Sequence, residues 1–240
     1  MNSPKRRGAA AYDGPSTDPE PITNHEARLL SLAAQRLDLV PQPASPPDKS
    51  TVVEMIRALG CVQLDSISVV SRSHETVLWS RLGAYDTALW SELYHPDGLV
   101  NEYWAHAAAI VPVESLHHFR RRMARYKDPS SDLHASWQPD HEVNRMVVET
   151  IRERGPLPSR AFARPEGPRA PAWSWYGGKP ANKALDYLWT CGDLTIHRRD
   201  AFQRVYELTE RRFPDFHSQP LPAEEEQRRF FVSRALSAMG

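Results

Sequence analysis

The sequence has 240 residues, 40% of them hydrophobic and 25% charged, which places it among ordinary globular proteins of one or two domains. Lys plus Arg and Asp plus Glu each total 30, so the formal net charge is zero. Without an overall positive field, the protein can bind nucleic acid only through local basic patches. The two cysteines, Cys61 and Cys191, fit no metal or redox spacing and are expected to be buried thiols.

The sequence contains no segment with the features of a membrane span or a secretory signal. No stretch approaches the ~18 apolar residues that a membrane span needs. The basic residues near the start are not followed by an apolar run, as they would be in a signal peptide. We expect a cytoplasmic protein without membrane association, and we take it to be a monomer. Residues 1–22 are rich in Pro, Gly, Ser and Asp and are expected to form a disordered tail.

Residues 23–126 are predicted to form a first module made mainly of helices. Apolar residues recur at helical spacing in segments that begin with capping residues and end at Gly or Pro. The predicted elements are helices at 25–37 after Asn24, at 51–59 between Asp48 or Ser50 and Gly60, at 73–81, at 86–93 and at 113–126, with a hairpin-like segment at 99–111.

Residues 140–212 are predicted to form a second module with a clearer pattern. Three helices followed by a two-stranded hairpin is the order of a winged helix-turn-helix, whose third helix lies in the major groove of DNA. The predicted elements are a helix at 140–154 closed by Gly155, a short helix opened by Pro158 and Ser159 that contains Phe162, a helix at 179–189, and strands at 193–198 and 201–208 joined by a turn at Arg198–Asp200. Segments 127–139 and 165–178 are predicted loops.

These patterns predict a mainly α protein with short β-hairpins, built of tandem winged helix-turn-helix modules, that binds double-stranded DNA. The first module repeats the order of the second less cleanly. Residues 220–239 predict a further amphipathic helix, with Phe230, Phe231, Ala235 and Leu236 on its apolar face. A terminal helix with an apolar face needs a partner. We therefore interpret residues 220–240 as the first helix of an incomplete third module.

The segment CVQLDSISVV carries the residues best suited to chemistry. Its alternation predicts a short strand with Val62, Leu64 and Ile67 inward, which places Gln63 and Asp65 together on the other face. An amide can orient a water molecule, and a carboxylate can accept its proton or stabilise nearby positive charge. An exposed polar face of a small sheet is the alternative, and the tripeptide alone favours it.

Five segments in order give the pair a wider context. They are LGCVQLDSISVVSRSHETVLWSRLGAYD (59–86), NEYWAHAAAIVP (101–112), IRERGPLPSRAF (151–162), WSWYGGKPANKALDYLWTCGDL (173–194) and FQRVYELTERRFP (202–214). Together they resemble the winged-helix DNA glycosylases of the AlkZ/YcaQ kind, which unhook interstrand crosslinks. The resemblance covers about residues 25–239.

That resemblance implies a DNA repair enzyme that excises N7-alkylated purines, crosslinked ones included, with no cofactor and no metal. It implies that Gln63 and Asp65 are the catalytic pair, in the Q-x-D form of the YcaQ branch; the AlkZ branch has Gln at both positions. Members of the family usually continue through a third winged helix into a C-terminal β-barrel, so the sequence corresponds to a chain truncated at Gly240. Ala107 also replaces an acidic residue that the family commonly has there.

Other residues are candidates for DNA binding, each with a structural alternative. His74 and His106 match histidine positions of the family and would reach the lesion or a phosphate, or else lie in the core. Tyr103 and Trp104 would stack on a base or pack internally. The remaining candidates are basic. Arg121 lies in the run Arg120–Arg122, near Arg125 and Lys127, on a helix face that either binds phosphates or faces solvent. Lys183 on the third helix and Arg198 and Arg199 at the hairpin tip are placed where they could contact DNA.

Two other functions remain open on the sequence alone. One is a non-catalytic DNA-binding protein, or a truncated relic of the family. The other is a protein-interaction fold that binds no nucleic acid, which the zero net charge keeps open.

Overall fold

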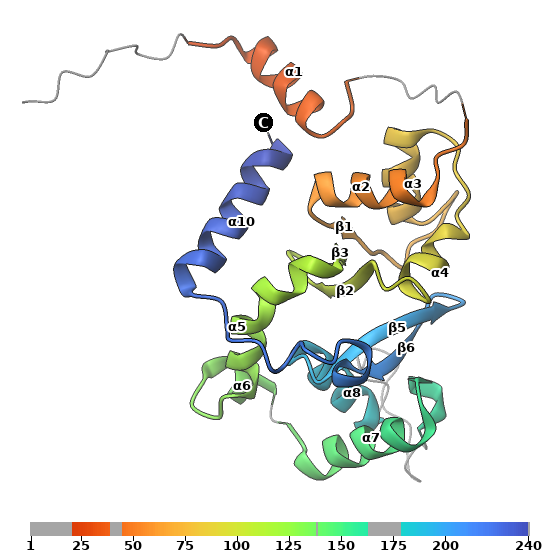
Figure 1. Ribbon diagram of the computed structural model, residues 1–240, viewed down its shortest axis with the longest axis vertical. Helices are drawn as coiled ribbons and strands as arrows, with labels where there is room; N and C mark the ends of the chain where they lie inside the picture. The colour runs from red at the N-terminus through yellow and green to blue at the C-terminus, as the bar shows by residue number, and fades with distance from the viewer. Residues whose placement is uncertain (1–20, 39–44, 138, 163–178, 240) are drawn as a thin grey trace, which may run out of the picture.

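The computed structural model describes residues 21–38, 45–137, 139–162 and 179–239. The predicted tail at 1–22 lies almost wholly outside this range, and so does the predicted loop at 165–178. In the described residues the protein is mainly α, with two small three-stranded antiparallel sheets (Figure 1). None of the helices described is both long and apolar enough to cross a lipid bilayer.

The first sheet has the strand order β1-β3-β2 and is covered by short helices. Of the two capping residues predicted, Asp48 rather than Ser50 caps the helix before β1. Gly60 ends that helix at a φ of 77°. Ile56, Leu78 and Leu93 have no exposed surface and form the core beneath the sheet. The elements of this region are α2 (Lys49–Leu59), β1 (Val62–Gln63), α3 (Ser73–Leu82), α4 (Leu89–Tyr94), β2 (Val100–Trp104) and β3 (Ala108–Pro112).

The second sheet has the strand order β4-β6-β5 and packs against two helices. Asp140 caps α7 through the backbone amides of Glu142 and Val143, and Gly155 ends it, as predicted. Val147, Ile151 and Leu185 are fully buried between the helices and the sheet. The elements are α7 (His141–Arg154), β4 (Leu157–Pro158), α8 (Pro180–Thr190), β5 (Leu194–Asp200), β6 (Gln203–Leu208) and α9 (Thr209–Arg212).

Two predictions about the second sheet are wrong. The hairpin turn lies at Ala201 and Phe202, which have positive φ angles of 45° and 68°, and not at Arg198–Asp200, which belongs to β5. The polar run Arg-Arg-Asp looks like a turn, but all three residues pair with β6. Arg198 and Asp200 form an ion pair with each other, and Arg199 binds Glu102. The predicted helix after Pro158 is a single 3₁₀ turn at Ser159–Ala161, and Phe162 lies just beyond it.

Other predictions for the first half need smaller corrections. The predicted loop at 127–139 contains α6 (Asp132–Trp137), and the predicted helix at 86–93 is only Leu89–Tyr94. The basic helix is confirmed as α5 (Leu116–Lys127) after a 3₁₀ turn at Val113–Ser115. Cys191 is buried as expected, whereas Cys61 is half-buried.

The first and last helices described lie near each other, away from the two sheets (Figure 1). Helix α1 (Asn24–Ala34) is capped by Thr23, not Asn24, because Thr23 and Glu26 form a capping box. Its predicted apolar face is not buried, since Leu29 and Leu30 are 50% and 54% exposed. Helix α10 (Glu224–Met239) packs two aromatic side chains against other residues: the ring of Phe231 lies 5.0 Å from that of Phe119, and the ring of Phe230 stacks at 3.7 Å on that of His118. Leu236 of the predicted apolar face is 65% exposed.

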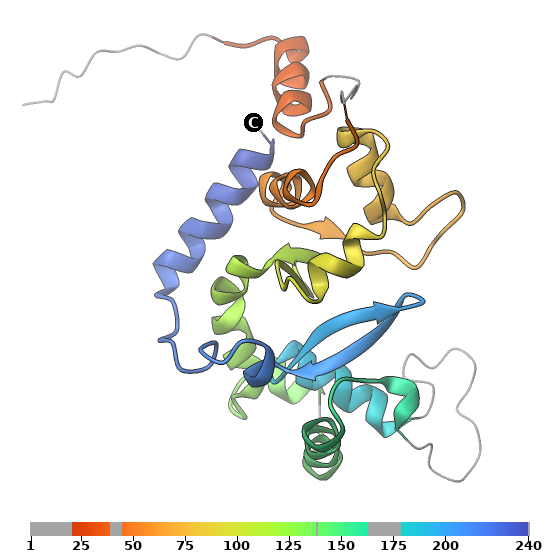
Figure 2. The same cartoon turned by 45° about the vertical axis from the view of Figure 1, so that its right-hand side comes forward.

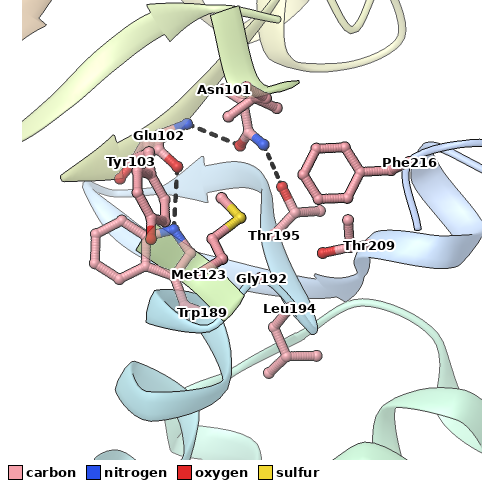
Figure 3. A pocket seen from close by; sticks show the side chains of 11 residues that line it. Asn101, Glu102, Tyr103, Met123, Trp189, Gly192, Leu194, Thr195, Thr209 and Phe216 are labelled. Atoms are coloured by element: carbon pink, nitrogen blue, oxygen red, sulfur yellow. Dashed lines mark hydrogen bonds between the residues drawn. The ribbon is translucent and has the colours of Figure 1, made fainter. Parts of the chain in front are cut away.

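The two sheets meet at β2 and β5, where buried polar groups are paired (Figure 3). The Asn101 amide donates to the Thr195 hydroxyl, and the Trp189 indole nitrogen donates to the Glu102 carbonyl at 3.1 Å. The cavity between these residues holds only about 10 Å³, so it is part of the packing and too small for a ligand.

The carboxylate of Glu102 is the strongest link across this junction. Its side chain is 0% exposed and accepts hydrogen bonds from Arg199 at 2.5 and 2.8 Å, from Arg204 at 3.3 Å and from the Tyr94 hydroxyl at 2.9 Å. Burial alone would raise the pKa of Glu102, but the hydrogen bonds and charge of Arg199, with the charge of Arg204, outweigh it and hold that pKa below its ordinary value. The carboxylate is therefore ionised at neutral pH and binds the β5–β6 hairpin to the first sheet.

We expect Glu102→Gln to lower the free energy of unfolding by about 3–5 kcal/mol, because it leaves two partly buried guanidinium groups without their counter-charge. Urea denaturation at pH 7 measures this loss. The lowered pKa means that the contribution is complete above the unfolded value of about 4.3 and is lost as the pH falls through the folded pKa. The variant should therefore show a weaker acid dependence below about pH 4 than the native protein.

Glu114→Gln is the matched control. Glu114 pairs with Arg57 at 2.7 Å, but the two side chains are 46% and 44% exposed. Its loss should change the stability by less than about 1 kcal/mol. Equal effects of the two substitutions would contradict a special role for Glu102.

Candidate functional site

The edge strand β1 and the extended residues directly after it present Gln63 and Asp65 on their outer side. Val62 and Leu64 are only 1% and 9% exposed, whereas Gln63 is exposed and Asp65 half-buried, so the predicted alternation is confirmed over these four residues. Gln63 pairs with Ala109 of β3, and the amide of Leu64 donates to the Ala108 carbonyl at 2.9 Å. Both polar side chains therefore leave the same side of one short extended segment.

The alternation does not continue to Ile67, and that part of the prediction is wrong. Ile67 is 68% exposed, because the chain leaves the sheet after Leu64 and turns. The turn is held by Asp65, whose Oδ1 accepts the backbone amide of Ile67 at 2.8 Å. The second carboxylate oxygen has no hydrogen-bond partner among the residues that the structure describes. Asp65 is therefore fixed by one oxygen and can offer the other to a ligand.

His106 orients the amide of Gln63. His106 lies in the turn between β2 and β3, and its Nε2 is 2.9 Å from Oε1 of Gln63. Because the amide oxygen can only accept, the imidazole donates this hydrogen bond. The amide NH₂ of Gln63 is thereby directed away from His106 and is available to bind a water molecule or a substrate oxygen. The sequence suggested His106 for contact with DNA, but the structure reveals in addition this contact with the candidate pair.

The other histidine candidate lies on the opposite side of β1. His74 is 7% exposed and lines a cavity of about 370 Å³ together with Leu64 and Ile110, whose side chains leave the sheet away from Gln63. Its ring lies 5.2 Å from that of Trp90, and burial, the largest influence, lowers its pKa. His74 is thus an uncharged, buried histidine at neutral pH, and the structure separates it from the pair.

The aromatic candidates are mainly packing residues. Tyr103 is 1% exposed and donates its hydroxyl to the Thr190 carbonyl at 2.6 Å, which links β2 to α8. Trp104 is 37% exposed, and its ring lies 5.6 Å from that of Trp189. From the sequence, either residue could stack on a base or pack in the core. Tyr103 packs in the core.

The basic candidates do not gather at one place. Arg199 is only 15% exposed and engaged with Glu102, so its donors are already in use. Arg198 pairs with Asp200 at 2.9 Å, and Nε of Arg121 donates to the Pro222 carbonyl at 2.7 Å. Lys183 is half-buried on α8. DNA contact by these residues stays a prediction, and Arg199 is the least suited of them.

Sequence reasoning missed the buried carboxylate of Glu102. Glu102 gave no signal, because an isolated Glu in a strand is normally exposed and its arginine partners lie 97 and 102 residues away in the sequence. The carboxylate of Glu102 also explains why Arg199 and Arg204 face inward from the hairpin.

Among the described residues, no group of three or more His, Cys, Asp or Glu side chains could hold a metal ion.

Comparison with known proteins identifies the family of the chain. A family model described as DNA glycosylase AlkZ-like matches residues 56–240, which is more than half of the chain and includes Gln63, Asp65 and His106. No solved structure matches the chain. The chain therefore belongs to the AlkZ-like family of DNA glycosylases, hydrolases that act on DNA.

Proposed function

We propose that this protein hydrolyses the N-glycosidic bond of N7-alkylated or crosslinked purines in duplex DNA. The observation that carries the proposal is the pair Gln63 and Asp65 at the end of β1. His106 orients the amide of Gln63, and one oxygen of the Asp65 carboxylate binds the Ile67 amide while the other stays available. The family match supports the reaction class. The pair itself supports a mechanism based on one water molecule.

A purine alkylated at N7 already carries a positive charge. When the bond between C1′ and the base nitrogen breaks, the base leaves with the bonding electrons as a neutral molecule, so no general acid is needed. The sugar becomes an oxocarbenium ion, which the Asp65 carboxylate can stabilise electrostatically. Gln63 would hold the water that adds to C1′, and Asp65 would take its proton. The products are a free base and an abasic site.

We also infer that residues 140–212 form a winged helix that holds the duplex. Helix α7, strand β4, helix α8 and the β5–β6 hairpin follow in the order of that fold, with β4 as the third strand of the sheet. Helix α8 would lie in the major groove, where Lys183 would meet a phosphate. Arg198 and Arg121 are the further candidates for phosphate contacts, and the first module would complete a tandem arrangement.

Asp65→Asn is expected to slow the release of N7-methylguanine from duplex DNA roughly 10²–10⁴-fold, because the carboxylate charge is lost while the side-chain oxygen can still accept the Ile67 amide. Gln63→Ala should have an effect of similar size. Abasic sites formed under single-turnover conditions, cleaved with alkali and separated on a gel, measure the rate.

Asp86→Asn provides a control with the same local geometry. Asp86 accepts the backbone amide of Ala88 at 2.9 Å, just as Asp65 accepts that of Ile67, but it lies outside the β1 edge. This control should react at the native rate. No abasic product from the native protein, or an undiminished rate for Asp65→Asn, would reject the proposed function and leave a DNA-binding protein without this activity.

A double-mutant cycle tests the positioning role of His106. We expect His106→Ala to lower the excision rate roughly 5- to 10-fold, the value of one orienting hydrogen bond of about 1 kcal/mol. In a Gln63→Ala background the same substitution should have little further effect, because there is no amide left to orient. Additive effects in the cycle would show that His106 acts independently of Gln63.

Lys183→Gln tests the orientation of α8 on the duplex. If Lys183 neutralises one phosphate, the substitution should lower the slope of log affinity against log salt concentration by roughly 0.9. Fluorescence anisotropy of labelled duplex over a salt series measures this slope. Arg228→Gln, on α10 with a side chain 69% exposed, should leave it unchanged. The same slope for Lys183→Gln and the native protein would remove α8 from the interface.

A further inference from the structure

The segment between β1 and α3 carries apolar side chains into solvent. Its sequence is SISVVS, residues 66–71, and we call it the apolar loop. Ile67 is 68% exposed, Val69 90% and Val70 99%. Figure 2 shows the loop, in orange, extending from the body of the molecule on the same side as the tip of the β5–β6 hairpin. These side chains bury almost no surface, so they contribute little to the stability of the fold.

Hydrogen bonds at its base hold the apolar loop in shape. Asp65 accepts the amide of Ile67 at 2.8 Å, and Nη1 of Arg72 donates to the Ser66 carbonyl at 2.7 Å. Ser68 and Arg72 form an antiparallel bridge. The two valines therefore stand at the end of a closed loop, and its base includes one of the candidate catalytic residues. Little ordering is needed before the tip can bind.

Arg72, the residue directly after the apolar loop, contacts the hairpin tip. The guanidinium carbon of Arg72 lies 3.7 Å from the centroid of the Phe202 ring, and the backbone amide of Arg72 donates to Glu75 at 3.1 Å. The loop thus begins directly after Asp65 and ends at Arg72, which lies against the hairpin that the proposed winged helix would place against DNA. A duplex bound at the hairpin would meet the loop.

We propose that the apolar loop is a wedge that enters the base stack of duplex DNA beside the alkylated nucleotide, with Val69 and Val70 between bases. The inference rests on the proposed function, since it assumes that Gln63 and Asp65 act on the sugar of that nucleotide. Val69 follows Asp65 by four residues, a reach of at most about 14 Å, which is comparable to the width of a groove. The tip can thus touch a base step next to the reacting sugar.

Insertion of apolar side chains has a clear physical effect on a duplex. Apolar wedges partly unstack a base step and kink the helix, at a cost of a few kcal/mol per step. That cost is lowest where a damaged base already stacks and pairs poorly. The wedge would therefore expose the glycosidic bond to Gln63 and Asp65 and would favour damaged sites over intact ones.

The size and composition of the apolar loop favour bases over a protein partner. A stable protein interface buries about 800 Å² on each side and usually centres on aromatic or Arg anchors. Three aliphatic side chains among serines offer much less. Small apolar side chains at the tip of a loop, by contrast, are of the kind that proteins insert between base steps.

The test uses a duplex with a stable abasic-site analogue next to 2-aminopurine, whose fluorescence rises when it is unstacked. Saturating native protein should raise the fluorescence. Val69→Ser/Val70→Ser should not raise it and should bind the duplex roughly 10- to 100-fold more weakly, because the apolar surface is no longer buried. Both valines are exposed, so the thermal unfolding of the variant should match that of the native protein. Val232→Ser, at a 57% exposed position on α10, should behave as native.

Excision of N7-methylguanine separates failure of the wedge from failure of the proposed function. The double variant should act roughly 10- to 100-fold more slowly than the native protein on duplex DNA and at a similar rate on single-stranded DNA, which has no stack to open. A native protein without excision activity would reject the proposed function. An active native protein matched by the double variant in fluorescence, affinity and duplex rate would overturn the wedge and leave the loop to another partner.

Discussion

The buried carboxylate of Glu102 is the interaction on which the arrangement of the whole site depends. It joins β2 of the first sheet to Arg199 and Arg204 of the hairpin, and so fixes the hairpin tip relative to the first sheet. Phe202 at that tip then lies against Arg72, directly after the apolar loop. A buried ion pair is weak evidence for stability in itself, but removing one partner is severe. Through these noncovalent contacts, Gln63 and Asp65 are held in a fixed position relative to the hairpin.

The edge position of β1 reconciles two opposing needs of the pair. A catalytic amide and carboxylate must be exposed to meet a sugar, yet they must also be held in place. The strand backbone pairs with β3 on one side only, which leaves the side chains of Gln63 and Asp65 accessible. One hydrogen bond then restrains each of them: His106 restrains the amide, and the Ile67 amide restrains the carboxylate. Both restraints come from turns next to the sheet, so each side chain keeps its remaining polar atom available.

Local features of this fold could be predicted from the sequence, and long-range ones could not. The helix ends at Gly60 and Gly155 and the alternation around Gln63 depend on neighbouring residues, so their patterns were sufficient. The hairpin turn was misplaced because Ala201 and Phe202 adopt positive φ angles without the Gly or Asn that usually marks such a turn. The contact of His106 with Gln63 spans 43 residues, and no local pattern encodes it. For the same reason Arg199 was predicted at a DNA surface although it faces Glu102.

Many arginine side chains are engaged within the fold, and this affects how the protein would bind DNA. Several arginines already bind internal groups: Arg199 and Arg204 bind Glu102, Arg120 and Arg121 bind carbonyls of the segment before α10, and Arg211 binds Glu207. With a formal net charge of zero as well, the long-range attraction to a duplex is small. Non-specific binding, which depends almost entirely on phosphate contacts, should then be weak. Recognition would rely more on short-range contacts at the lesion. An apolar loop beside the pair supplies contacts of that kind, because base insertion depends on shape and desolvation and is far less sensitive to salt than phosphate binding.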